Sequence, residues 1–139
     1  MIILDTNVLS AVMRRDADLA VVAWLDRQPA ESLWVTTITI FEVRFGLELL
    51  PDSRRRRELE EAFSQALKED FQRRILPFDF PAAEEAALLA ARRRSAGRAV
   101  DFRDTQIAGI AMARQATLAT RNIRHFEDLS VAVVDPWTC

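Results

Sequence analysis

The chain has 139 residues, half of them apolar, and a formal net charge of −2 at pH 7. This size and composition predict one globular domain, residues 1–139, with a single core. No apolar stretch is long enough to span a membrane, and the first residues lack the features of a secretion signal. Because Cys139 is the only cysteine, no disulfide can form within the chain, and we expect a cytoplasmic protein. The net charge excludes nucleic-acid binding through bulk charge.

Apolar stretches and helix-breaking residues divide the chain into strands and helices. In chain order we expect strand 1–4, helices 7–13 and 18–28, strand 33–36, helices 40–50 and 54–71, strand 75–79, helices 81–97 and 104–115, and strands 117–120 and 131–134. Strands separated by helical segments are typical of βαβ units. We therefore predict an α/β fold with a central parallel β-sheet flanked by α-helices.

One acidic residue directly follows the first predicted strand. Residues 1–4 are typical of a strand buried in a parallel sheet, and Asp5, Thr6 and Asn7 come immediately after them. The carboxyl ends of such strands are where open α/β sheets bind their ligands. A buried carboxylate is costly to ionise alone, so Asp5 needs a helix N-terminus, a cation or a metal ion as a partner.

Two further acids, Glu42 and Asp104, each extend the apolar face of a predicted helix by one turn. The residues on these faces lie three, four and seven positions further on, and they are Phe45, Gly46 and Leu49 for Glu42 and Ile107, Ala108 and Ala111 for Asp104. Both acids are expected in the first helical turn, where the helix dipole favours a carboxylate. We therefore expect three carboxylates to converge at one edge of the sheet.

Each of these acids also has a purely structural interpretation. Asp5 can cap the helix that follows it. Thr39 and Glu42 have the spacing of a capping box, in which the glutamate bonds back to the backbone of the cap residue. Asp104 can serve only to complement the helix dipole. These roles are compatible with metal ligation, and the coincidence of three such acids favours a shared site.

The residue types restrict which ion such a site would take. Convergent carboxylates repel one another, and a divalent cation relieves that repulsion. His125 is the only histidine and Cys139 is the last residue, so a zinc site built from cysteine and histidine is excluded. A site made of oxygen ligands favours Mg²⁺ or Mn²⁺, which would activate a water molecule as a nucleophile.

Polar and basic side chains gather in the segment after the fourth predicted strand. Residues 120–126 carry a hydroxyl, an amide, two guanidinium groups and an imidazole, supplied by Thr120, Asn122, Arg121, Arg124 and His125. At the same edge of the sheet these groups could hold a phosphodiester beside the metal. The alternative is a polar loop with Asn122 in a turn.

Two arginine-rich segments have an ordinary and a functional interpretation. Residues 54–57, followed by several glutamates, and residues 92–94 with Arg98 are typical of solvated helix surfaces with pairs four residues apart. They could instead contact an RNA backbone or an acidic partner segment.

Taken together and in order, these motifs resemble the PIN domain. The motifs are Asp5-Thr6-Asn7 after an apolar strand, Thr39-x-x-Glu42 followed by Gly46, Asp104-x-x-Ile107-Ala108, and Ala119-Thr120-Arg121-Asn122. The segment Val134-Asp135-Pro136-Trp137 resembles the end of the FitB-like and VapC branch of that family. The resemblance covers essentially the whole chain.

The resemblance implies a Mg²⁺- or Mn²⁺-dependent endoribonuclease that is the toxin of a type II toxin–antitoxin pair. By position, Asp5 and Asp104 would be direct metal ligands, and Glu42 a third ligand or a positioner of water. The family also implies a homodimer and a cognate antitoxin that inserts a segment into the active-site groove. Operator DNA would be contacted only through that antitoxin.

This chain departs from the family pattern at two positions. Many members have a fourth acid where this chain has Asn122, and an aspartate where it has His125. Asn122, which completes the candidate catalytic set, offers a carbonyl oxygen but no charge. The site would therefore bind metal more weakly or recruit a second ion with its substrate. Asp101, one helical turn before Asp104, could compensate.

We therefore expect hydrolysis of RNA phosphodiester bonds, with Arg121 or Arg124 contacting a phosphate. The alternative is a catalytically weakened module that acts mainly as a regulatory subunit with its antitoxin and DNA, which the residues at positions 122 and 125 motivate. A phosphoacceptor of the receiver type would need a lysine after a late strand, whereas Lys68 lies in a charged helix. No glycine-rich loop for a nucleotide is present.

Overall fold

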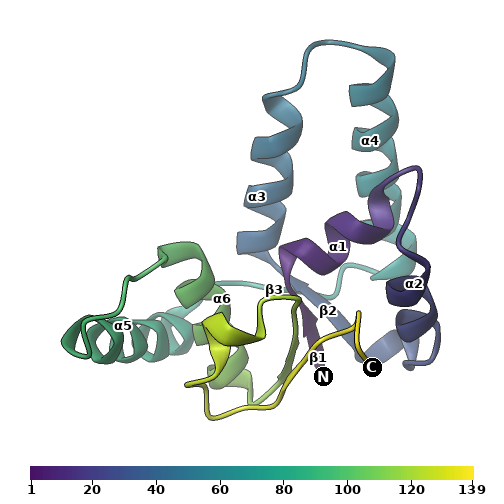
Figure 1. Ribbon diagram of the computed structural model, residues 1–139. Coiled ribbons are helices and arrows are strands. Elements are labelled where there is room, and N and C mark those ends of the chain that lie inside the picture. Colours follow the sequence, from purple (N-terminus) through teal and green to yellow (C-terminus); the bar gives the residue numbers. More distant parts are fainter.

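The computed structural model describes residues 1–139 and contains a five-stranded parallel sheet (Figure 1). Its strands are β1 (Ile2–Leu4), β2 (Leu33–Thr36), β3 (Ile75–Leu76), β4 (Thr117–Ala119) and β5 (Val133–Val134). Its α-helices are α1 (Thr6–Met13), α2 (Leu19–Asp26), α3 (Thr37–Glu48), α4 (Arg54–Gln65), α5 (Phe80–Ser95) and α6 (Phe102–Arg114). Short turns of helix occur at η1 (Ala30–Ser32), η2 (Ala66–Asp70) and η3 (Ile123–Phe126). The predicted α/β fold with a parallel sheet is confirmed.

The strand order in the sheet is β3-β2-β1-β4-β5. The chain therefore builds outward from β1 to β2 and β3 on one side, and then crosses to place β4 and β5 on the other side. The strand order reverses between β1 and β4, and open α/β sheets bind their ligands at the carboxyl ends of the strands at such a point. Residues that follow β1 and β4 are thus brought to one place by topology alone.

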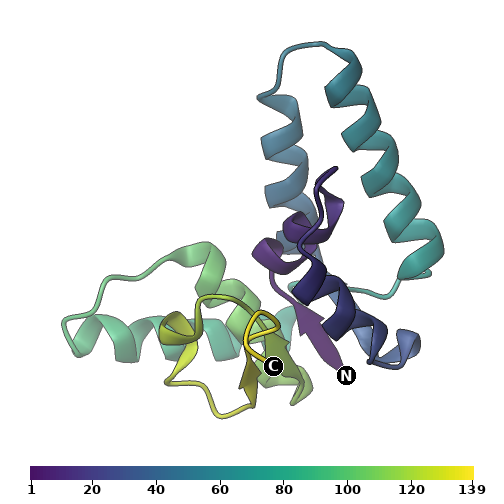
Figure 2. The same cartoon turned by 45° about the vertical axis from the view of Figure 1, so that its right-hand side comes forward.

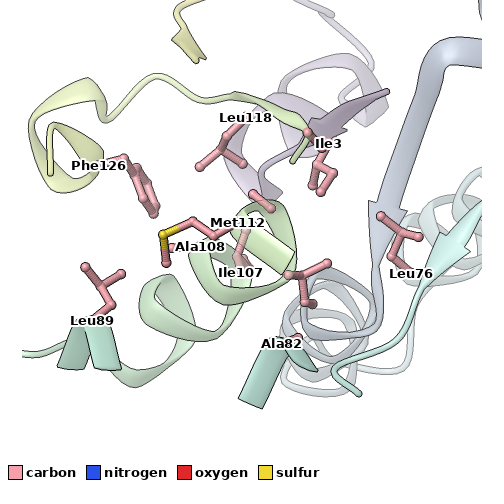
Figure 3. Close-up of a cluster of buried hydrophobic side chains, with 12 residues drawn as sticks. Ile3, Leu76, Ala82, Leu89, Ile107, Ala108, Met112, Leu118 and Phe126 are labelled. Atoms are coloured by element: carbon pink, nitrogen blue, oxygen red, sulfur yellow. The ribbon is translucent and has the colours of Figure 1, made fainter. Parts of the chain in front are cut away.

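The sheet separates two hydrophobic cores because alternate residues of a strand point to opposite faces. Ile3 of β1 packs with Leu118 of β4 in the first core, where α5 and α6 cover the sheet (Figure 3). Leu4, the next residue, packs with Val35 of β2 in the second core, which α1, α2 and α4 cover. Figures 1 and 2 show these helix groups on opposite sides of the sheet. No helix is long and apolar enough to cross a membrane.

Helices α5 and α6 approach each other very closely at Gly109. A Cβ atom at this position would lie 2.5 Å from the carbonyl oxygen of Ala82 and 2.7 Å from Cβ of Ala86. The alanines on α5 and the glycine on α6 thus let the two backbones pack almost directly against each other. This contact fixes α6, the helix that carries Asp104, over the sheet.

Several elements begin or end at other residues than the sequence predicted. Helix α3 begins at Thr37 and not at residue 40, because the hydroxyl of Thr36 accepts the N–H of Thr39 and acts as the cap. The strand predicted for 75–79 ends at Leu76, since Pro77 cannot donate to the sheet and Asp79 caps α5. Helix α4 ends at Gln65 and continues as the wider turn η2.

The arginines at the start of α4 form ion pairs with acidic residues of the same chain. Arg56 contacts Glu60 at 2.7 Å and Glu48 of α3 at 2.9 Å, while Arg54 contacts Glu58 at 3.1 Å. The interpretation of this run as a paired, solvated helix surface is therefore confirmed. Arg93 in the second run differs, because it is only 5% exposed, and its expected position on a solvated surface is wrong.

Candidate functional site

Asp5 and Thr120 lie side by side at the carboxyl ends of β1 and β4. The register pairs Leu4 with Ala119, so the next residue of each strand stands at the same level. The backbone N–H of Asp5 donates to the carbonyl oxygen of Ala119 at 2.9 Å, which continues the pairing beyond the strands. An acid and a hydroxyl from distant parts of the chain are therefore placed together by the sheet itself.

The carboxylate of Asp5 is buried, with 4% of the residue exposed, and accepts several hydrogen bonds. Oδ2 accepts from the Thr120 hydroxyl at 2.7 Å and from the Asn7 amide at 3.3 Å. Oδ1 accepts from the backbone N–H of Thr6 at 2.8 Å, so that Asp5 also caps α1. The capping role is thus confirmed, and the second oxygen is held by Thr120 and Asn7.

Burial raises the pKa of the Asp5 carboxyl group from its ordinary value of 3.8 to about 6. Desolvation is the largest cause, and the hydrogen bonds from Thr120 and Thr6 act against it. The negative charges of Asp104 and Glu42 raise the pKa further. Asp104 and Glu42 therefore both lie close enough to repel the ionised Asp5, as expected for a shared site.

Glu42 reaches the site from the second turn of α3, since that helix begins at Thr37. Its Oε1 accepts a hydrogen bond from the Thr6 hydroxyl at 2.9 Å, and Arg103 of α6 lies 3.6 Å from its Oε2. The predicted capping box with Thr39 is wrong, because Thr36 is the cap of α3. Glu42 is thus free of a capping role and contacts groups from α1 and α6.

The expectation that Glu42 extends a core-facing stripe is also wrong. Phe45 and Leu49, on the same side of α3, are 52% and 69% exposed. The side of α3 that meets the core is a different one, since Thr39 and Leu47 are its buried residues. An exposed apolar face therefore runs along α3, and Phe41 stacks on Phe45 there with ring centroids 6.2 Å apart.

Asp104 lies in the first turn of α6, as predicted, and its companions Ile107, Ala108 and Ala111 are buried. Asp101 caps this helix, and its Oδ1 accepts the N–H of Asp104 at 3.1 Å. Oδ2 of Asp104 lies 3.1 Å from Nδ1 of His125. Asp101 thus fixes the backbone at Asp104, and the imidazole of His125 contacts its carboxylate.

The loop after β4 is joined to the site mainly through its backbone. The N–H of Asn122 donates to the Thr120 hydroxyl at 3.1 Å, and the N–H of Arg121 donates to Oδ1 of Asn7 at 3.2 Å. The guanidinium of Arg121 lies over the ring of Trp137, 4.8 Å from its centroid, a typical cation–π contact. The side chains of Asn122 and Arg124 are exposed to solvent.

Some contacts of the site could not be named from the sequence. Arg103, which pairs with Glu42, is an exposed residue in the first turn of α6 and belongs to no motif. The bond from the Thr6 hydroxyl to Glu42 joins residues 36 positions apart, and no local pattern indicates it. Thr120 had a usable signal, because it ends a strand predicted to lie in the same sheet as the strand before Asp5.

The donor atoms fit a hard divalent cation in their chemistry, since every candidate ligand offers oxygen. The negative charges of Asp104 and Glu42, which add to the effect of burial on the pKa of Asp5, are charges that such a cation would offset. As the side chains stand, no group of three or more acids, histidines or cysteines is arranged to hold a metal ion. Glu42 and Asp104 are instead paired with Arg103 and His125.

The fold and the site together define an α/β protein in which acidic residues lie at the point where the strand order of a parallel sheet reverses. The family model described as "PIN domain" matches residues 2–131, and the chain belongs to this family. The chain is 41% identical to the plasmid stability protein StbB of Pseudomonas syringae and 36% identical to a VapC ribonuclease of Sinorhizobium fredii. It is 37% identical to the toxin FitB of Neisseria gonorrhoeae. These matches cover 99% of this chain and 98–99% of each relative.

A solved structure shows the same similarity in three dimensions. The chain superimposes on the crystal structure of FitAcB from Neisseria gonorrhoeae with a TM-score of 0.90 and 37% identity, covering 100% of both chains. The resemblance of the sequence motifs to the PIN domain is confirmed.

Proposed function

We propose that this protein is an endoribonuclease, dependent on Mg²⁺ or Mn²⁺, and the toxin of a type II toxin–antitoxin pair. The observation that carries the proposal is the buried Asp5, whose pKa is raised by burial and by the charges of Asp104 and Glu42. The capping of α1 accounts for Asp5 alone and does not explain why two more acids lie near it. The names of the relatives, a VapC ribonuclease and a toxin, support this reading of the site.

In this proposal Asp5 and Asp104 hold the ion, and Glu42 is a third ligand or orients the attacking water. A bound divalent ion lowers the pKa of water and stabilises the charge that develops on the phosphate. The chain itself positions the acids, since the hydroxyl of Thr120 holds Asp5 and that of Thr6 holds Glu42. Fixed hydrogen bonds of this kind keep ligands in place at no further cost during the reaction.

The loop at residues 121–125 would hold the RNA strand beside these acids. Arg121 or Arg124 would contact a phosphate, and Asn122 would offer an amide to the same group. Both arginines are exposed, but Arg121 lies over Trp137, so Arg124 is the freer of the two. Trp137 would keep the Arg121 guanidinium beside the loop in the absence of RNA.

The direct test replaces Asp5 or Asp104 with asparagine. We expect RNA cleavage to fall about 100-fold or more in each variant, because each loses a charge that the ion needs. Asp79→Asn is the control, because Asp79 also caps a helix, by accepting the N–H of Ala82, but has no part in the site. Chelation by EDTA should abolish cleavage, and Mg²⁺ or Mn²⁺ should restore it. Full metal-dependent activity in purified Asp5→Asn protein would exclude the proposal.

We also propose an antitoxin partner and a homodimer, with operator DNA bound only through the antitoxin. The slightly acidic net charge supports an indirect contact with DNA. The arginine run of α4, the densest basic segment, is already paired with glutamates of the same chain. It therefore offers little free positive charge to a DNA backbone.

One observation favours a second function, that of a catalytically weakened regulatory subunit. Asn122 supplies no charge where many family members have an acid, and Glu42 and Asp104 are in contact with Arg103 and His125. Isothermal titration calorimetry with Mg²⁺, combined with a cleavage assay, separates the two functions. Metal binding with cleavage supports the nuclease, and the lack of both supports the regulatory subunit.

A further inference from the structure

Arg93 is the one buried cation of the chain, and it lies on α5, outside the cluster of acids. Only 5% of it is exposed, although it carries a full charge. A buried guanidinium is costly unless acceptors surround it. Its neighbours on the helix, Arg92 and Arg94, are exposed, so the burial of Arg93 is specific to its position.

The acceptors of Arg93 come from the segment that carries the polar loop. Nε and Nη2 donate to the two carboxylate oxygens of Asp128 at 2.9 and 2.8 Å, and Nη2 also donates to the carbonyl oxygen of His125 at 2.6 Å. The pairing with Arg93 holds the pKa of Asp128 below its usual range. On its other side Nη1 lies 3.5 Å from the hydroxyl of Thr105, in the first turn of α6.

His125 connects the Arg93–Asp128 pair to the site. Its carbonyl is held by Arg93, its N–H donates to the carbonyl of Asn122 at 3.0 Å, and its ring lies 3.1 Å from Asp104. The fixed backbone of His125 thus decides where the imidazole meets the carboxylate. Only a planar fork with several donors can serve Asp128 and this carbonyl together, which a lysine could not do.

We propose that Arg93 is a positioning residue, which acts through Asp128 and the carbonyl of His125 to hold the imidazole against Asp104 and the 122–125 segment beside the acids. Its importance for cleavage rests on the nuclease function proposed above, whereas the effect on His125 and Asp104 does not. The ordinary alternative is that Arg93 only joins α5 to the loop and contributes to stability.

The ring of His125 reports on the proposal directly, because it is the only histidine in the chain. Its imidazole signals in a two-dimensional NMR spectrum are therefore unambiguous. Asp104→Asn gives the reference spectrum for a ring that has lost the carboxylate. We expect Arg93→Met, recorded at the same pH, to move the ring signals from the wild-type position toward that reference. Arg92→Met, an exposed neighbour, should leave them unchanged.

A second variant keeps the test decisive if Arg93→Met does not fold. Asp128→Asn conserves shape and removes one half of the charge pair, and it should shift the same signals in the same direction. A folded Arg93→Met or Asp128→Asn protein with wild-type ring signals would overturn the proposal, even if its stability is reduced. Equal shifts in Arg92→Met would overturn it as well.

Cleavage kinetics supply the functional half of the test. Loss of groups that orient a ligand typically costs about 10- to 100-fold. We expect Arg93→Met to lower kcat by this factor and to change KM for RNA little, while Arg92→Met retains wild-type kcat. An unchanged kcat in folded Arg93→Met would refute the link to catalysis. If the wild type cleaves no RNA, the nuclease function fails, and the NMR comparison still decides the role of Arg93.

Discussion

Removal of the Asp5 charge should stabilise the protein at neutral pH in the absence of divalent ions. The carboxyl group has a pKa of about 6 in the folded chain and an ordinary value of 3.8. One pKa unit corresponds to about 1.4 kcal/mol, so ionised Asp5 opposes folding by about 3 kcal/mol. Asparagine removes this cost and can still cap α1 by accepting the N–H of Thr6.

The direction of the pH dependence follows from the raised pKa. Between the two pKa values the folded chain binds more protons at Asp5 than the unfolded chain, so the stability of the wild type falls as pH rises from about 4 to about 6. Below this range Asp5 is protonated in both states and its contribution vanishes. The advantage of Asp5→Asn should therefore be near zero at pH 4 and approach 1–3 kcal/mol, as an order of magnitude, at pH 7.

Urea unfolding in EDTA, followed by tryptophan fluorescence at several pH values, measures this difference. Both proteins must be compared at equal concentration, since association would change their apparent stability. Asp79→Asn, another helix cap, serves as the control and should show no comparable gain at pH 7. A difference between Asp5→Asn and wild type that stays flat from pH 4 to pH 7 would refute the argument.

Two further predictions test the site's support and the packing. Thr120→Val removes a hydrogen bond that lowers the pKa of Asp5, so the pH range in which stability falls should extend to higher pH. Thr120→Ser keeps the hydroxyl and should retain the wild-type range. Identical pH profiles of unfolding for the valine and serine variants would contradict this. Gly109→Ala should destabilise the fold by about 1–3 kcal/mol, because its Cβ would meet Ala82 and Ala86. Gly46→Ala is the control, because nothing lies within 4 Å of the added Cβ, and it should be neutral or stabilising by up to about 1 kcal/mol. Equal losses of stability in the two variants on thermal unfolding would refute the close contact at Gly109.

The sequence predicted the fold well because its signals are local. A strand that ends in Asp5 and a helix that carries Asp104 on its buried side both follow from short patterns of apolar residues. Helix α3 shows how a local signal can mislead, since a threonine three residues earlier than expected is the cap. That shift places Glu42 in the second turn, and the packing of α3 separately leaves Phe45 and Leu49 on an exposed face.

The contacts within the site join residues that are far apart in the sequence, so no local sequence pattern indicates them. The bond between Thr120 and Asp5 joins residues 115 positions apart, and that between His125 and Asp104 joins residues 21 apart. Arg93 is the clearest case, because three adjacent arginines look equivalent in the sequence. Only the packing of α5 against the loop shows that the middle one is buried.

The order of the strands also sets the time at which the site can form during synthesis. Asp5 and β1 are made first, but β1 gains its partner β4 and Asp5 gains the Thr120 hydroxyl only 115 residues later. At about 5–20 residues per second this delay is on the order of ten seconds. A nascent chain on the ribosome therefore carries the acid without its site. Any activity that needs the assembled acids begins only after the fourth strand has emerged.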